Sequence, residues 1–386
     1  MAERETLRPT TAEDLREEVA RAARDGYAIE VRGGGSKQDI GSPGRRTTVV
    51  DLGAMSGVVD YEPSELVLTV RPATPLVQIE DILAKQGQML AFEPWDHAPL
   101  FGAERRATIG GIVAAGVAGP RRVSAGGARD HLLGFEAVSG RGELFKGGGK
   151  VVKNVTGYDV SKVIAGSWGQ LAIMTELTLK VLPRPRTVAT AAIEGLRAEA
   201  AISAMARAMG SPCAVAAAAH MPATGDRSAV TAFRIEGFAE SVAARVEDLA
   251  ATLAADGRCA VMNPADSSRL WDAVAMAGPL AGCETLWRAH VAPSRAGALI
   301  AALDALGASY LADWAGAALW IGAPANCAVR AAVKASGGHA MLVRAPVALR
   351  AGTPARQPEA PGVAALSARV KHAFDPAGIL DPHRFD

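Results

Sequence analysis

The sequence predicts an α+β protein of two domains, and three observations lead to this prediction. At 386 residues the chain exceeds the size at which a single hydrophobic core usually divides. Up to about Pro183, short strands alternate with helices and glycine-rich turns. Beyond residue 186 the order strand–helix–strand–strand–helix–strand occurs twice, which predicts an antiparallel sheet with helices on one face. The other face must then be covered or must itself form a site.

The composition is typical of a globular protein and argues against several classes. Hydrophobic residues make up 49% of the chain, and 41 basic against 40 acidic residues leave a net charge of +1. Without a basic stripe, no nucleic-acid partner is expected. The N-terminus is charged, and no apolar run approaches the ~20 residues of a membrane span. We therefore expect a cytoplasmic protein without a secretory signal or a transmembrane segment.

The cysteines show no cluster pattern. No C-x-x-C pair occurs, so neither an iron–sulfur cluster nor a zinc site is expected. Reduced, buried thiols are the simplest interpretation of the four positions: Cys213, Cys259, Cys283 and Cys327.

The first part of the chain is predicted from caps and periodicity. A helix is expected over 10–25, where Thr10 or Thr11 caps it and Leu15, Val19 and Ala22 share one face. A strand in "YAIEVRG" leads into a glycine loop, and "TTVVDLG" and "ELVLTVRPA" contain further strands. The segment "PLVQIEDILAKQG" is a helix with proline at its start and glycine at its end. The stretch 183–186, "PRPR", is a plausible domain boundary.

The second part is predicted element by element. Val242, Val246, Leu249 and Leu253 form the apolar stripe of one of its helices. The first repeat has strands 187–194, 213–220, 228–236 and 258–262 with helices 197–210 and 239–255. The second has strands 284–291, 308–313, 317–322 and 338–344 with helices 294–306 and 325–336. A turn-rich linker over 350–362 and a last helix follow. The expected domains are 1–185, with two subdomains split near residue 75, then 186–350, then a C-terminal segment 351–386.

The stretch "VRGGGSKQDIG", Val31 to Gly41, contains three consecutive glycines, whose backbone could bind a ligand. Consecutive glycines let successive N–H groups converge on one point, and such concavities bind anions such as phosphate. Ser36 adds a hydroxyl and Lys37 a charge. The spacing fits neither the P-loop nor the G-x-G-x-x-G fingerprint. Taken alone, the loop therefore allows a phosphate site or a flexible turn.

Three further segments narrow this choice: 107–148, which contains "ATIGG" and "RDHLLGFEAVSGRGE"; 153–183, which opens with "KNVTGYDVSK"; and 371–385, "KHAFDPAGILDPHRF". Together with "RGGGSK" they resemble the FAD-binding fold of the vanillyl-alcohol oxidase and p-cresol methylhydroxylase superfamily. The phrases "KNVTGYDVSK" and "RDHLLGFEAVSGRGE" are most similar to the FAD-binding subunits of bacterial glycolate oxidases. The resemblance covers residues 10–185 and the C-terminal segment.

The resemblance implies an FAD-binding domain at 1–185 and a cap domain at 186–350, with 351–386 returning to the first domain. The FAD pyrophosphate would lie against Arg32, Gly33, Gly34, Gly35, Ser36 and Lys37. The phosphates and flavin would lie against Thr108, Ile109, Gly110 and Gly111, and the adenosine end against Ser167, Gly169 and Ile173. Ala172 departs from the family pattern, in which glycine is common there. The glycine loop contains neither histidine nor cysteine, so the FAD is expected to be non-covalent.

The chemistry of substrate oxidation is harder to assign. Catalytic relatives often carry an H-x-G-D-G-N-x-H motif late in the cap, but this chain reads "GGHAMLVRAPVALRAGTP" there, and no metal site is expected. Strand alternation places Arg288 and His290 on one face and Trp287 on the other. Together with Arg344, they are candidates to bind the carboxylate of a hydroxy acid and to accept its hydroxyl proton. The alternative is that they are rim residues without a catalytic role.

Three functions remain open. The chain is expected to be the FAD-binding subunit of a glycolate (2-hydroxy acid) oxidase complex. A larger FAD-containing catalytic subunit and an iron–sulfur subunit would be its partners, on exposed cap faces, and any membrane association would come through these partners. A self-sufficient flavin dehydrogenase is the first alternative. A scaffold that has lost FAD is the second, which the intact glycine segments argue against.

Overall fold

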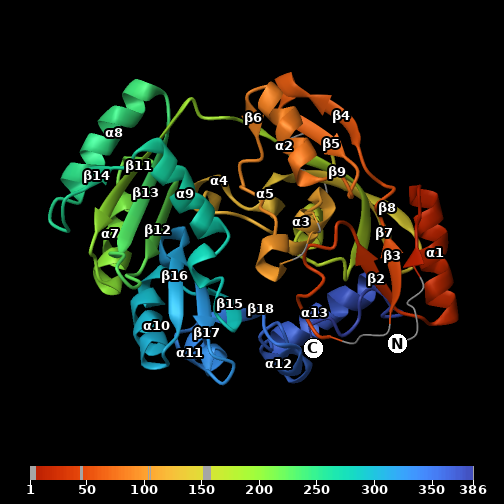
Figure 1. The fold of residues 1–386 in the computed structure, drawn as a ribbon. Coiled ribbons are helices and arrows are strands. Elements are labelled where there is room, and N and C mark those ends of the chain that lie inside the picture. The colour runs from red at the N-terminus through yellow and green to blue at the C-terminus, as the bar shows by residue number, and fades with distance from the viewer. Residues whose placement is uncertain (1–5, 44–46, 103, 105, 151–157, 386) are drawn as a thin grey trace. The chain divides into compact units, whose positions relative to one another are not determined.

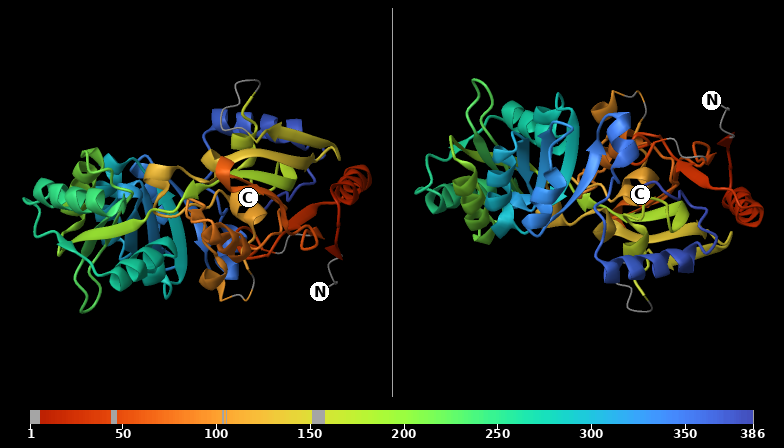
Figure 2. Two further views of the ribbon diagram at one scale, coloured as in Figure 1. Left: turned by 90° about the horizontal axis from the view of Figure 1, so that it is seen from above. Right: turned by 90° about the horizontal axis from the view of Figure 1, so that it is seen from below.

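The computed structural model describes residues 6–43, 47–102, 104, 106–150 and 158–385 (Figures 1 and 2). The motif residues 153–157 lie outside this set. The chain forms two compact units. The first unit contains residues 1–118, 126–184 and 358–386, and the second contains 119–125 and 185–357.

The first unit begins with a helix and a small parallel sheet. Helix α1 (Ala12–Asp25) starts at Thr11, whose side chain accepts from the Asp14 N–H while the Asp14 carboxylate accepts from the Thr11 N–H. These bonds and those from Thr10 lower the pKa of Asp14 to about 2. The predicted apolar face of the helix is fully buried. The sheet has the order β1 (Thr6–Leu7), β3 (Thr48–Asp51), β2 (Ile29–Arg32).

A second, antiparallel sheet follows in the same unit. Its order is β4 (Val58–Glu62), β5 (Val67–Val70), β9 (Ala172–Lys180), β7 (Leu132–Ser139), β8 (Leu144–Gly148). The chain passes from the first sheet to the second between Asp51 and Val58. Strand β4 was not predicted. The remaining elements are α2 (Leu76–Lys85), α3 (Ile109–Ala115), α5 (Ala128–His131), α6 (Ser161–Ile164), and the pair β6 (Gln88–Met89) with β10 (Leu182–Pro183).

The C-terminal segment completes the first sheet. After α13 (Pro361–Phe374), the backbone of Ile29 donates to Ile379 at 2.8 Å and accepts from Asp381 at 2.7 Å. The buried carboxylate of Asp375 accepts from the N–H groups of Ile379 and Leu380 and pairs with Lys371. One carboxylate therefore fixes the turn that carries the last residues of the chain alongside β2.

The second unit is an eight-stranded antiparallel sheet, and both predicted repeats are present. One face of the sheet carries α7 (Ala198–Gly210), α8 (Ala239–Thr252), α10 (Pro293–Ala305) and α11 (Val329–Ala335), which bury a continuous core against it (Figure 1). The strand order is β14 (Ala260–Val261), β11 (Thr187–Glu194), β13 (Val230–Gly237), β12 (Ala217–Met221), β16 (Ser309–Asp313), β17 (Ala318–Ala323), β15 (Thr285–His290), β18 (His339–Arg344).

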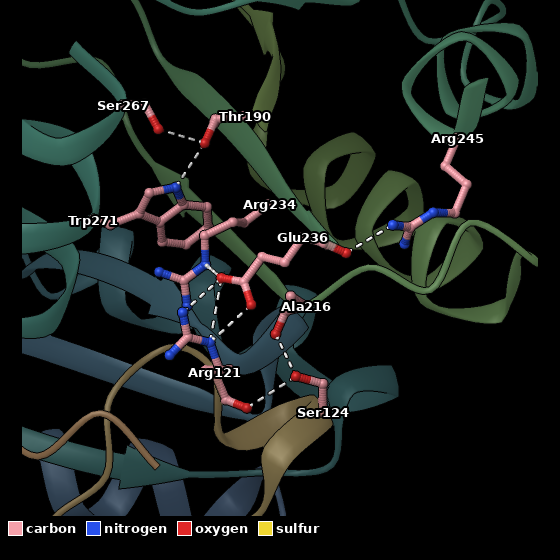
Figure 3. Close-up of polar contacts among 9 residues, drawn as sticks. All are labelled: Arg121, Ser124, Thr190, Ala216, Arg234, Glu236, Arg245, Ser267 and Trp271. Carbon is pink, nitrogen blue, oxygen red and sulfur yellow. Dashed lines mark hydrogen bonds and ion pairs between the residues drawn. The ribbon is translucent and has the colours of Figure 1, made fainter. Parts of the chain in front are cut away.

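Helix α9 (Pro264–Ala275) was not predicted, and it lies on the opposite face of this sheet. The Trp271 indole N–H donates to the Thr190 hydroxyl at 2.9 Å, and the Arg234 guanidinium lies over the same indole (Figure 3). Thr190 alternates with Ala191, a residue of the helix-side core, so α9 covers part of the other face. The short α12 (Val347–Gly352) begins just ahead of the predicted linker and extends into it. None of the helices in the described ranges combines the length and hydropathy needed to cross a membrane.

We predict that Asp375→Ala destabilises the protein by about 2 to 3 kcal/mol, because it leaves two buried N–H groups without an acceptor. Urea unfolding of the full chain measures the change. Asp375→Asn keeps one acceptor and should lose less. Asp159→Ala, which removes an exposed carboxylate paired with Lys162, is the matched control and should change the free energy of unfolding little. Equal losses in Asp375→Ala and the control would contradict the assigned role.

Candidate functional site

The glycine loop follows β2 and lies against the backbone of a second segment. A Cβ on Gly34 would stand 1.7 Å from the carbonyl oxygen of Arg106, and a Cβ on Gly33 would stand 2.5 Å from the Thr108 hydroxyl oxygen. Gly35 has a φ of 74°, which favours glycine. The run of glycines is therefore required by close packing and by backbone conformation, and it is not a generic turn.

The second segment, "TIGG", begins a short helix. Thr108 precedes α3, and the Gly110 N–H donates to the Pro72 carbonyl at 2.8 Å. A Cβ on Gly110 would stand 2.7 Å from Pro72 Cβ, whereas a Cβ on Gly111 would stand 3.9 Å from Lys37 Nζ. Gly110 thus packs on the first unit's interior, and Gly111 faces the glycine loop.

These segments and residues 168–174 enclose a hollow, which we call the glycine-loop pocket. Its volume is about 100 Å³. The predicted residues that line it are Arg32, Gly33, Gly34, Gly35, Ser36, Lys37, Thr108, Gly110, Gly111, Gly169 and Ile173. Two predicted residues do not line it. Ile109 is fully buried in the core, and the Ser167 hydroxyl is buried nearby.

The pocket holds polar atoms that the described part of the chain does not satisfy. The side-chain oxygen of Thr108, Nε of Arg32 and Nε of Arg384 are buried without a hydrogen-bond partner among the described residues. Buried polar atoms in folded proteins are normally paired, so these atoms point to a polar ligand.

Lys37 is a buried cation in the same pocket. Its side chain is 7% exposed, and Nζ lies 3.3 Å from the Ser36 hydroxyl. Burial lowers the pKa of Lys37 to about 8, the charge of Arg384 lowers it further, and Asp96 opposes this shift. A bound anion would offset the cost of burying this charge. The donors, the glycine backbone and the lysine together fit the pyrophosphate of a dinucleotide.

Arg384 and Trp168 are pocket residues that the sequence analysis missed. Arg384 Nη2 donates to the Lys37 carbonyl at 2.8 Å, Nη1 pairs with Asp381 at 2.7 Å, and the guanidinium lies 5.3 Å from the Trp168 ring centre. The available signal was "DPHRF", which belongs to one of the segments that carried the resemblance. Nothing in that signal showed that the chain end reaches the glycine loop.

In the second unit, Arg288 and His290 lie on the sheet face opposite the helix-side core, as strand alternation predicts. The Arg288 guanidinium lies 4.7 Å from the Trp314 ring centre and 4.9 Å from that of Trp320, and Arg122 lies 4.6 Å from Trp314. We call these four residues the arginine–tryptophan cluster. The His290 ring stacks on Trp314 at 5.1 Å and lies 5.2 Å from the His339 ring.

The charge states in and beside this cluster follow from burial. Burial lowers the pKa of Arg288 to about 10, the charge of Asp313 opposes this shift and that of Arg122 adds to it, so the guanidinium stays charged at pH 7. The pKa of His290 is lowered to about 3 by burial first and then by the charges of Arg288, His339 and Arg122. His290 is therefore a neutral imidazole beside two cations.

Arg344 contacts the loop before β15. Its Nη2 donates to the carbonyls of Ala281 at 2.7 Å and Cys283 at 2.9 Å, which holds the loop before β15. Arg122 converges on the indole of Trp314 instead. The sequence analysis missed Arg122 because it lies far from the cap strands along the chain.

The segment 119–125 that carries Arg122 is anchored to the sheet of the second unit. The Trp314 indole N–H donates to the Gly119 carbonyl at 3.0 Å, and the Ser124 hydroxyl donates to the Ala216 carbonyl at 2.8 Å. Arg121 and Arg234 both pair with the Glu236 carboxylate (Figure 3). Because Arg121 and Glu236 are largely buried, this ion pair fixes the segment more firmly than a surface pair would.

The sequence matches to known proteins fall mainly in the first unit. Residues 5–148 match the FAD-binding domain family. The chain is 46% identical over 172 residues to glycolate oxidase subunit GlcE of Escherichia coli (strain K12), which is 45% of this chain and 47% of that protein. It is 32% identical over 136 residues to glycolate oxidase subunit GlcD of Bacillus subtilis (strain 168), which is 35% of this chain and 27% of that protein. The matches thus span less than half the length of these relatives.

Solved structures share the whole fold. A p-cresol methylhydroxylase with substrate bound aligns with a TM-score of 0.68 at 15% identity, over 98% of this chain and 88% of that one. An alkyldihydroxyacetonephosphate synthase aligns with a TM-score of 0.69 at 16% identity, over 98% of this chain and 76% of that one. The predicted fold class, the family resemblance and FAD as cofactor are confirmed.

We predict that Gly34→Ala weakens FAD binding by at least tenfold, because the new Cβ would overlap the Arg106 carbonyl and force the two segments apart. Titration of the flavin-free chain with FAD, followed by flavin fluorescence, measures the affinity. The control is Gly149→Ala, whose Cβ would meet nothing within 4 Å. Unchanged affinity in Gly34→Ala would contradict the close packing described above.

We also predict that FAD affinity falls between pH 7 and pH 9. Lys37 of the free protein has a pKa of about 8, and a bound pyrophosphate would raise it, so above pH 8 binding requires proton uptake and weakens by up to tenfold per pH unit. Lys37→Met should weaken binding at pH 7 and flatten the profile. Lys85→Met, at an exposed lysine, should leave the profile unchanged. Parallel profiles for the wild type and Lys37→Met would refute this role for Lys37.

Proposed function

We propose that this chain is the FAD-binding subunit of a multi-subunit oxidoreductase, because residues 5–148 match the FAD-binding domain family. Its substrate would be a small 2-hydroxy acid such as glycolate. The glycine-loop pocket, with its buried lysine and unsatisfied donors, is the observation that carries the cofactor assignment. The 46% identity to a protein named as a glycolate oxidase subunit supports the substrate class and the subunit role.

In this proposal the residues of the glycine-loop pocket bind and orient the cofactor. Backbone N–H groups of Gly33 to Gly35 would donate to the pyrophosphate, and Lys37 and Arg384 would balance its charge. The Thr108 hydroxyl would find its missing partner there. FAD, when bound, supplies a reversible two-electron acceptor.

The cofactor is proposed to be non-covalent. The residues that line the glycine-loop pocket include no histidine and no cysteine, the side chains that link flavins covalently in some relatives. We predict that acid precipitation of the purified chain releases all flavin into the supernatant. Flavin absorbance that stays with the precipitate would refute non-covalent binding.

The proposed partners are a larger FAD-containing subunit, which would oxidise the substrate, and an iron–sulfur subunit, which would take up the electrons. Both come from the family resemblance. Among the described residues no three metal-ligating side chains converge. Native purification of the tagged chain tests this assignment, with the flavin and iron contents of each co-purifying chain measured.

A self-sufficient dehydrogenase is the second candidate, and the arginine–tryptophan cluster is the observation that favours it. Arg122 and Arg288 would bind a carboxylate, and His290 would accept the hydroxyl proton. A histidine with a pKa of about 3 is a weak base at pH 7, which favours the accessory-subunit role. A scaffold without FAD would have no use for buried donors around the glycine loop.

We predict that the isolated chain carries a flavin spectrum that glycolate does not bleach in the absence of oxygen. The same addition to the native complex should bleach its flavin. Bleaching of the isolated chain that is lost in Arg288→Met would establish the second candidate instead. Failure to take up FAD at any concentration would refute both flavin functions.

A further inference from the structure

A second hollow lies within the second unit, on the helix side of the sheet, where the two repeats meet. The repeats are joined by β12 and β16, which share one paired position, His220 with Ala312. Helices α7 and α10 flank this junction. The hollow has a volume of about 1350 Å³, opens to solvent, and shares no lining residue with the glycine-loop pocket.

The walls of this hollow are apolar and made of small side chains. Ala198 and Ala206 of α7 face Gly297, Ala298 and Ala301 of α10, and none of these side chains can fill the space between the helices. Ile202 and Ile300 add apolar surface below them. The small size of these α7 and α10 side chains explains why the space between the helices is not filled.

The floor consists of two hydrogen-bonding rings, which we call the His220–Tyr310 pair. The two residues are 1% and 6% exposed, and their ring centres lie 6.2 Å apart. His220 Nδ1 lies 2.9 Å from the Thr231 hydroxyl, which leaves Nε2 for another partner. Neither this Nε2 nor the Tyr310 hydroxyl has a hydrogen-bond partner among the described residues. Both residues line the hollow, so these two atoms are available to a ligand that enters it.

Both rings are uncharged near neutral pH. Burial lowers the pKa of His220 to about 4. Burial, together with the charge of Asp304 on the rim, raises the pKa of Tyr310 to about 12. A neutral floor under apolar walls disfavours charged ligands, since a buried charge without a counter-ion is costly. The rim groups Arg197, Glu199 and Asp304 carry both signs.

We propose that this hollow binds a neutral, largely apolar small molecule through one hydroxyl or carbonyl oxygen, which hydrogen-bonds to Tyr310 and His220. A phenol is the simplest member of this class: its ring matches the apolar walls, and its hydroxyl can both donate and accept. The proposal does not depend on the function assigned to the glycine-loop pocket.

The test uses the full chain as purified, with 4-fluorophenol as the probe, followed by fluorine NMR. We expect saturable binding that weakens about fivefold in Tyr310→Phe, the loss of roughly one hydrogen bond. Ala301→Trp, which puts an indole into the part of the hollow between α7 and α10, should also weaken binding. Tyr158→Phe, at a tyrosine that is 97% exposed, is the matched control and should bind like the wild type.

Circular dichroism and the flavin spectrum of each variant verify that the fold and the glycine-loop pocket are intact. If Tyr310→Phe fails to fold, Ala301→Trp alone decides, because it changes an exposed position. The absence of saturable binding in the wild type would overturn the proposal. Binding that is unchanged in both Tyr310→Phe and Ala301→Trp would also overturn it, because the probe would then occupy another site.

Discussion

The first unit depends on the approach of two backbone segments without side chains between them. The glycine loop after β2 touches the residues before α3 so closely that even a methyl group on Gly34 would overlap a carbonyl oxygen. This contact brings the Lys37 ammonium, the Thr108 hydroxyl and the loop amides to one place. The pocket thus exists because the glycines have no Cβ atoms, and its positive charge comes from Lys37 and Arg384.

The local pattern of apolar residues in the sequence was sufficient to predict most of the helices and strands. The two repeats of the second unit were predictable because their helices bury regular apolar stripes, such as Val242, Val246 and Leu249, against strands of ordinary length. Helix α9 was missed although Asn263 caps it and Pro264 begins it. Its place on the opposite face depends on the Trp271–Thr190 contact, which joins residues 81 positions apart.

The sites were less predictable for the same reason. Glycine runs mark where the backbone must approach something, so the pocket-forming loops could be found from sequence. Arg384 could not, since its role depends on a hydrogen bond to Lys37 across 347 positions. Strand alternation correctly placed Arg288 and His290 on one face, but it could not show that Arg344 is bound to two loop carbonyls or that Arg122 shares an indole with Arg288.

The path of the chain has a consequence for biosynthesis. The polypeptide passes between the two units four times, at 118/119, 125/126, 184/185 and 357/358, so neither unit is one continuous stretch. The edge of β2 receives its last partner from Ile379 and Asp381, and Arg384 follows them. A nascent chain in which the glycine loop has already been synthesised therefore still lacks Arg384, which contacts that loop. The glycine-loop pocket therefore depends on residues more than 300 positions apart, and deletion of residues 377–386 would remove both Arg384 and the backbone bridge at Leu380 that positions it.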